Sequence, residues 1–116
     1  MPPLPPPPVP QKLREMLRDY PEHIVRLQEV LNSAIDPTKT HLMPFDEAIW
    51  ALEGALEAFI DEARDELQAA EASGDPVAIE RAKAKKFLMG QTCFKGRWIG
   101  DEALWVYFQT NKDAFE

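Results

Sequence analysis

The chain has 116 residues, the usual length of one domain, and its 20 acidic and 13 basic side chains give a formal net charge of −7. An acidic surface repels phosphate backbones and anionic lipids, so this charge disfavours nucleic acids and membranes as partners. The single cysteine excludes an internal disulfide, and there is neither a secretory signal nor an apolar run near the ~20 residues that span a bilayer. We therefore expect a cytoplasmic protein that binds no membrane.

The first ten residues, MPPLPPPPVP, hold seven of the eleven prolines. Proline fixes φ and has no backbone N–H, so this composition predicts an extended polyproline II tail over residues 1–10. A single helical domain is expected over residues 11–116. The P-x-x-P spacing is typical of segments that bind aromatic grooves, but a spacer or a strap over the protein's own surface is the preferred interpretation.

A helical period of apolar residues begins at Gln11 and keeps its phase across Pro21. Asp19 and Glu22 have the spacing of a capping box, which would start a new helix at this proline. We therefore predict two nearly collinear helices, over residues 11–19 and 20–35. A linker with two prolines follows, over residues 36–44.

The longest predicted element is an amphipathic helix over residues 45–73, which contain no proline. At about 1.5 Å per residue it would be roughly 40 Å long, whereas a compact domain of this size has a radius of gyration of about 13 Å. It therefore needs a hairpin partner of similar length or a second subunit. Its apolar stripe consists of Phe45, Ile49, Leu52, Leu56, Phe59, Ala63, Leu67 and Ala70.

The remaining pattern predicts a helical hairpin and an aromatic cap. Gly74 would end the long helix, and Asp75-Pro76 would start an antiparallel helix that continues to about Met89. A small β-hairpin is possible over residues 92–99, and Asp101 would cap a last helix, from Glu102 to about Thr110. The predicted fold class is therefore all-α: an antiparallel helical bundle built on a long central helix, with Leu27 and Leu31 also in its core.

Carboxylates on the long helix allow an enzymatic alternative. The spacing of Glu53, Glu57, Glu62 and Asp65 would suit a Mg²⁺-dependent nucleotide pyrophosphohydrolase, in which acids from two helices converge on a metal. The facing helices offer only Glu22, Glu29 and Glu80 for the required second pair. A solvated acidic face is the preferred interpretation, with no metal or cofactor.

The other reactive side chains give weaker signals. His23 and His41 have no partner at metal-ligand spacing, so both are expected to be ordinary surface histidines. Lys95 and Arg97 could stabilise a thiolate at Cys93, but a lone cysteine between apolar residues is more often a small buried hydrophobe.

Residues 81–97 contain basic and aromatic side chains and no acid, which allows a further alternative, nucleic-acid binding. Because helix 45–73 carries enough acid to neutralise these cations, we favour intramolecular pairing. The basic residues are Arg81, Lys83, Lys85, Lys86, Lys95 and Arg97, and the aromatic ones are Phe87 and Phe94, with Trp98 next to them.

Trp50 stands out because it lies on the polar side of the long helix, one turn before Gly54. We expect something to cover it: the proline-rich segment, the C-terminal aromatics, a second subunit or a foreign protein. A flank of small residues, Ala48, Ala51, Ala55 and Ala58, favours a homodimer.

The sequence as a whole favours a non-catalytic, acidic, helical interaction protein of adaptor, chaperone or inhibitor type. The candidate interaction residues are Trp50, Gly54, Trp98, Trp105 and Tyr107.

Overall fold

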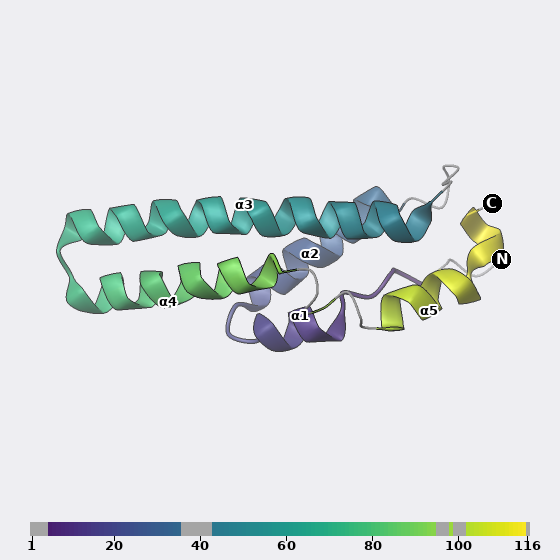
Figure 1. Ribbon diagram of the computed structural model, residues 1–116, viewed down its shortest axis with the longest axis horizontal. Coiled ribbons are helices and arrows are strands. Elements are labelled where there is room, and N and C mark those ends of the chain that lie inside the picture. Colours follow the sequence, from purple (N-terminus) through teal and green to yellow (C-terminus); the bar gives the residue numbers. More distant parts are fainter. Residues whose placement is uncertain (1–4, 36–42, 95–97, 99–101, 116) are drawn as a thin grey trace.

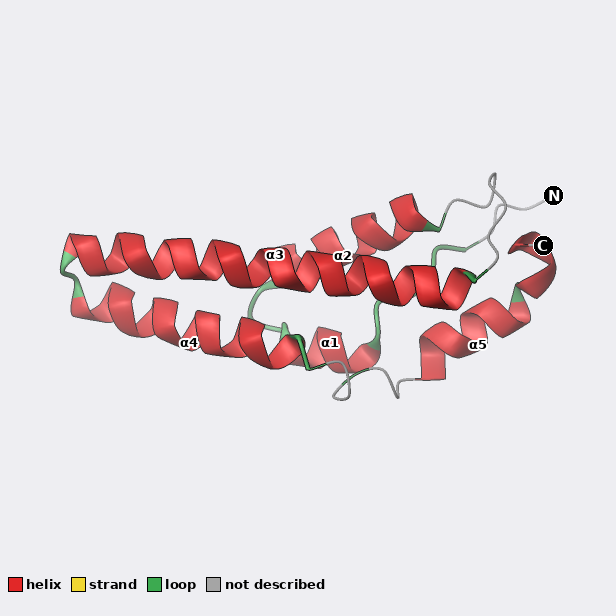
Figure 2. Ribbon diagram, turned by 45° about the horizontal axis from the view of Figure 1, so that its top comes forward, coloured by secondary structure: helices red, strands yellow, loops and turns green. Residues whose placement is uncertain are grey.

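The computed structural model describes residues 5–35, 43–94, 98 and 102–115, and its elements in this part of the chain are all helical (Figure 2). The predicted all-α fold class is thus confirmed. The elements are α1 (Gln11–Met16), α2 (Pro21–Ala34), α3 (Pro44–Ser73), α4 (Pro76–Thr92), α5 (Glu102–Thr110) and a short 3₁₀ helix, η2 (Lys112–Phe115).

Helices α3 and α4 form the predicted antiparallel hairpin (Figure 1). The chain leaves α3 through Gly74, whose φ of 72° is the left-handed conformation that glycine adopts without strain. Asp75 then caps α4, because its side chain accepts a hydrogen bond of 3.0 Å from the backbone N–H of Val77, and Pro76 occupies the first helical position. Helix α4 continues past the predicted end at Met89 and closes at Thr92.

The first two helices are separate, as predicted, but they are not collinear, and the predicted capping box is not found: the residue before α2 is Tyr20, and no side chain caps this helix. After α1 the chain turns back before it enters α2 (Figures 1 and 2). Tyr20, in the turn, has φ −130° and ψ 65°, which lie outside the α region that is disfavoured for a residue before proline. The apolar residues keep one helical period across Pro21 because each helix buries its apolar side against a different neighbour. Helix α2 packs on α3, and α1 packs on α4.

The core lies where these helices meet α3, and most of the predicted core residues are in it. Leu27, Leu31, Leu52, Leu56 and Phe59 are all buried. Leu67, also on the predicted stripe, is only partly buried. Side chains of α4 that include Lys83 and Phe87 lie beside it and leave it partly open to solvent.

The molecule is elongated, with extents of 55 × 24 × 22 Å and a radius of gyration of 16.4 Å. A compact chain of this length would have a radius of about 13 Å. The long helix does have a hairpin partner, α4, but with 17 residues α4 is much shorter than the 30-residue α3, and α2 and α5 also pack on α3. The other predicted way to accommodate the long helix, a homodimer, stays a prediction.

The described part of the proline-rich segment is held against the protein. Val9 is buried, and the carbonyl oxygen of Pro7 accepts a hydrogen bond of 2.7 Å from the side-chain amide of Gln28 in α2. The hydroxyl of Tyr107 in α5 donates to the carbonyl oxygen of Pro5. Residues 5–10 are therefore a strap that joins α2 to α5, which was one of the two preferred interpretations of this segment, beside a spacer.

Helix α5 covers the end of the bundle at which α3 begins (Figure 1). The Phe45 ring of α3 meets the rings of Trp105 and Phe108 edge to face, with centroids 5.2 and 6.4 Å apart. The first half of the predicted β-hairpin is wrong, because Thr92 is the last residue of α4 and Cys93 forms a turn. Residues 36–42, 95–97 and 99–101, which include His41, Asp101 and most of the second half of that hairpin, lie outside the described residues.

Candidate functional site

The most exposed tryptophan of the described chain is Trp50, on α3, with 58% of its surface open to solvent. Met43 lies two helical turns before it and is 49% exposed. Gly54 follows one turn later, and a Cβ placed there would have no atom within 4 Å. Of the neighbouring acids, Glu57 is exposed and Asp46 is partly exposed, and together these residues form one stripe along α3, which we call the Trp50 surface.

Two of the four predicted covers of Trp50, the proline-rich segment and the C-terminal aromatics, are wrong for the described residues, because Trp50 is exposed among them. The strap reaches α2 and α5 instead, through Gln28 and Tyr107. The ring of Trp105 packs against Phe45. The described parts of both candidate covers are therefore engaged elsewhere, and a cover by a second subunit or a foreign protein stays a prediction.

The other candidate interaction residues divide into exposed and internal ones. Trp105 is about half exposed, at 49%. Trp98 is 1% exposed, and its indole N–H donates a hydrogen bond of 2.8 Å to the carbonyl oxygen of Thr92. Tyr107 is also buried. Only Trp50, Gly54 and Trp105 therefore lie at the surface.

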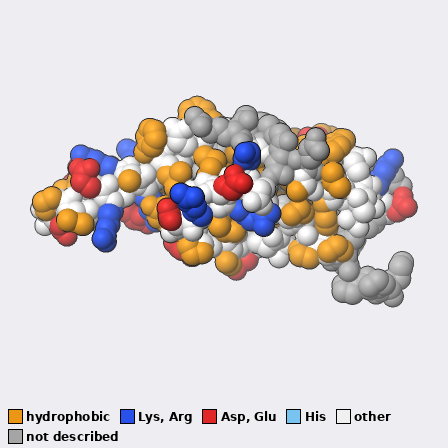
Figure 3. Space-filling view, turned by 90° about the horizontal axis from the view of Figure 1, so that it is seen from below, with side chains coloured by type: hydrophobic (Ala, Val, Ile, Leu, Met, Phe, Trp, Pro, Cys, Tyr) orange, Lys and Arg blue, Asp and Glu red, His pale blue; other side chains and the backbone are white. Residues whose placement is uncertain are grey.

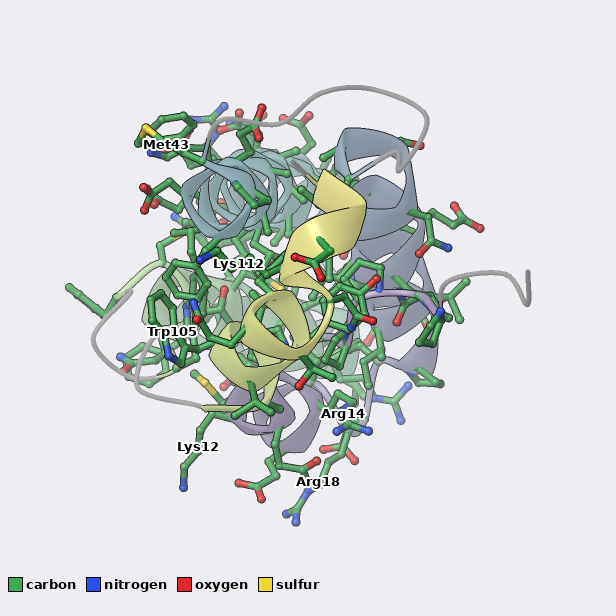
Figure 4. The ribbon with its side chains drawn as sticks, turned by 90° about the vertical axis from the view of Figure 1, so that its right-hand side faces the viewer. Lys12, Arg14, Arg18, Met43, Trp105 and Lys112 are labelled. Atoms are coloured by element: carbon green, nitrogen blue, oxygen red, sulfur yellow. The ribbon has the colours of Figure 1, made fainter. Side chains whose placement is uncertain are left out.

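A view along the long axis shows how the exposed groups are distributed at this end (Figure 4). Met43 and Trp105 lie toward the same side of the molecule, whereas Arg18 extends from a different edge. Lys12 extends on the same side as Trp105, and Lys112 is labelled between Met43 and Trp105, so this view does not separate the apolar side chains from cations.

The four carboxylates of the enzymatic alternative do not converge. Glu62 faces α2, where both of its oxygens accept hydrogen bonds from Arg26, at 2.8 and 2.6 Å. These bonds lower the pKa of Glu62. Glu53 and Glu57 instead lie beside Cys93 and Trp98, and Asp65 is exposed. No group of three or more His, Cys, Asp or Glu side chains in the described residues is arranged to hold a metal ion.

Two of the basic residues of α4 lie beside acids. Lys85 pairs with Glu66 of α3 at 2.9 Å, as predicted, whereas Lys83 lies 3.8 Å from Glu80 in its own helix. In the view from below (Figure 3), basic and acidic side chains are mixed over the left half, where the α3–α4 hairpin lies. Lys95 and Arg97, which would extend a basic patch, lie outside the described residues.

Cys93 has the environment of a structural cysteine. It packs against the core, and burial raises the pKa of its thiol, with further contributions from Glu57 and Glu53. A reactive cysteine has a lowered pKa, so the raised pKa of Cys93 favours the interpretation that it is a small apolar packing residue.

The prediction for His23 is wrong, because its side chain is buried at 4% exposure. Its ring meets Phe59 edge to face with centroids 4.4 Å apart, and Tyr20 lies on another side at 5.7 Å. The nearest acid, Glu22, is 3.5 Å from Nδ1, too far for a good hydrogen bond, and this nitrogen has no partner. Burial lowers the pKa of His23, and the charge of Lys85 lowers it further. The sequence contained a signal for this burial: His23 lies three residues after Tyr20 and four before Leu27, which places it on the apolar face of the helix.

None of the described helices combines the length and the apolar character that crossing a lipid bilayer requires. Comparison of the chain with models of known protein families, with curated proteins and with solved structures found no match.

Proposed function

We propose that this is a non-catalytic interaction protein, of adaptor, chaperone or inhibitor type, that binds a protein partner through the Trp50 surface. The exposure of Trp50 is the observation that supports this proposal most strongly. Tryptophan is enriched among the residues that carry most of the binding energy at protein interfaces, because it offers a large apolar area with few rotatable bonds.

The position of Trp50 on the fold suits a binding role. Leu52 and Leu56, on the opposite face of α3, are fully buried, so Trp50 stands on a helix that the core holds in place. A rigid support reduces the entropy lost on binding. At Gly54 the missing side chain lets a partner's backbone come close.

The charge around Trp50 indicates the chemistry of the partner. Asp46 and Glu57 lie one and two turns from Trp50 on the same side of α3. A complementary partner would present cations around an apolar or aromatic centre. Cys93 is a free cysteine, and free cysteines are usual in the reducing cytoplasm. We therefore also propose that binding takes place in the cytoplasm.

The alternatives have less support from the described residues. The pyrophosphohydrolase hypothesis needs Glu62 free to bind a metal, and this carboxylate is already paired with Arg26. The nucleic-acid hypothesis needs a continuous basic surface, and Lys85, in the middle of the predicted one, is paired with Glu66 of α3.

Photo-crosslinking in the native cell tests the proposal. A photoreactive amino acid at position 50 is expected to form a defined covalent adduct with a protein. Gln68 provides the matched control: it is exposed, and it lies on the same face of α3 about five turns further along. Equal labelling at positions 50 and 68, or none at position 50, would contradict the proposal.

A further inference from the structure

A second exposed apolar surface lies on the hairpin, between α3 and α4. It is a groove of about 440 Å³ whose lining includes Leu67, Lys83, Lys86, Phe87 and Phe94, and we call it the α4 groove. Phe87 and Phe94 are the most exposed large apolar side chains described, at 70% and 61%. Leu67 is incompletely covered because it forms part of this groove.

The α4 groove arises because α4 carries apolar residues on both sides. Ala82 and Met89 are buried against the rest of the protein. Phe87 points away from this contact, so that packing within one chain leaves its ring open to solvent. A helix that is apolar on two sides has a second surface available for a partner.

The charge of the α4 groove is opposite to that of the protein as a whole. Among the described residues that line it, the charged ones are Lys83 and Lys86, and none is acidic. Lys83 has Glu80 at 3.8 Å, but both side chains are more than half exposed, so this contact holds Lys83 only weakly. An occupant that complements the groove therefore carries an aromatic or apolar group with carboxylates beside it.

The Trp50 surface has this chemistry, with an exposed indole beside Asp46 and Glu57. We infer that the Trp50 surface of one copy of this chain binds the α4 groove of another copy. The indole would pack on Phe87 and Phe94 while the carboxylates approach Lys83 and Lys86. This inference rests on the proposed function, because it names a partner for the Trp50 surface.

One chain cannot make this contact with itself. Trp50 and Leu67 are 17 residues apart on the same continuous helix, which separates them by roughly 25 Å. The contact must therefore join two copies, and it joins two different surfaces. Such an arrangement can close into a ring or extend into longer assemblies.

Mixing two inactivated variants tests the inference. In Trp50→Glu the tryptophan surface is lost and the groove is intact, whereas in Phe87→Glu the groove is blocked and the tryptophan surface is intact. In sedimentation velocity, the wild-type protein is expected to exceed 13.2 kDa as its concentration rises, and each variant alone is expected to stay at 13.2 kDa. The equimolar mixture is expected to form a particle of twice 13.2 kDa through the one remaining pair of complementary surfaces.

A wild-type protein that remains a monomer at high concentration would overturn the inference, and so would a mixture that remains monomeric. Both substitutions are at exposed positions, so unchanged circular dichroism and thermal melts are the expected controls. The outcome is distinguishable from that of the proposed function. A monomeric protein that still crosslinks to a foreign partner at position 50 would keep the proposed function and exclude self-assembly.

Discussion

Replacing Leu56 with alanine is expected to lower the free energy of unfolding by about 2–5 kcal/mol. Leu56 lies in the middle of α3 and is fully buried, so the substitution removes apolar area from the core and leaves a cavity that the rigid helices fill only in part. Chemical denaturation of the purified variant measures the loss.

Ala58 provides the matched control for Leu56. It lies two residues further along α3 and is exposed, so Ala58→Ser should change the free energy of unfolding by no more than about 0.5 kcal/mol. A loss below about 1 kcal/mol for Leu56→Ala would show that the apolar stripe of α3 does not face the core.

Acidification is expected to destabilise the protein through His23. The folded state lowers the pKa of this imidazole below its ordinary value of 6.5, so between the two pKa values the unfolded chain binds more protons than the folded one. The contribution of His23 to stability is therefore complete above pH 6.5 and declines as the pH falls below that value. Each unit by which the pKa is lowered corresponds to about 1.4 kcal/mol.

The surroundings of His23 explain why protonation is unfavourable. The buried ring has an unpartnered nitrogen, and Lys85 and Arg26 oppose a positive charge, while Glu22 and Glu62 favour it more weakly than burial and Lys85 together disfavour it. The titration of Glu62 does not interfere, because its pKa is lowered from 4.5 and its loss of charge occurs at lower pH.

Thermal melts from about pH 7.5 to about pH 5.5 check this prediction, with His23→Gln as the control that cannot titrate at this site. His41 is present in both proteins, so its contribution cancels. The wild-type melting temperature should fall more steeply than that of the variant. Parallel curves would show that His23 is not held in its neutral form.

The sequence predicted the parts of the fold that local chemistry determines. The hairpin turn lies where the sequence predicts it, because the residues that form it affect only the adjacent backbone. These residues are Gly74, Asp75 and Pro76. The apolar stripe of α3 likewise predicted Leu52, Leu56 and Phe59 as core residues. These features follow from backbone sterics and helical periodicity.

Tertiary arrangement determined what the sequence could not predict. A continuous apolar phase across Pro21 suits one straight helix or two helices that bury their stripes against different neighbours, and the fold has the second arrangement. Leu67 belongs to the stripe, but it is only partly covered because it lines the open α4 groove. A large apolar side chain such as Trp50 is usually covered, which is why a cover was predicted, but the strap and α5 pack on other parts of the protein.

The central claim, that α3 presents an open tryptophan surface, is tested most directly by the fluorescence of Trp50. Subtracting the emission spectrum of Trp50→Phe from that of the wild-type protein isolates this residue without altering the buried Trp98. At protein concentrations low enough to prevent self-association, the difference spectrum should resemble free tryptophan and be readily quenched by acrylamide. A blue-shifted difference spectrum that is protected from the quencher would contradict the account, because it would mean that the chain covers Trp50 itself.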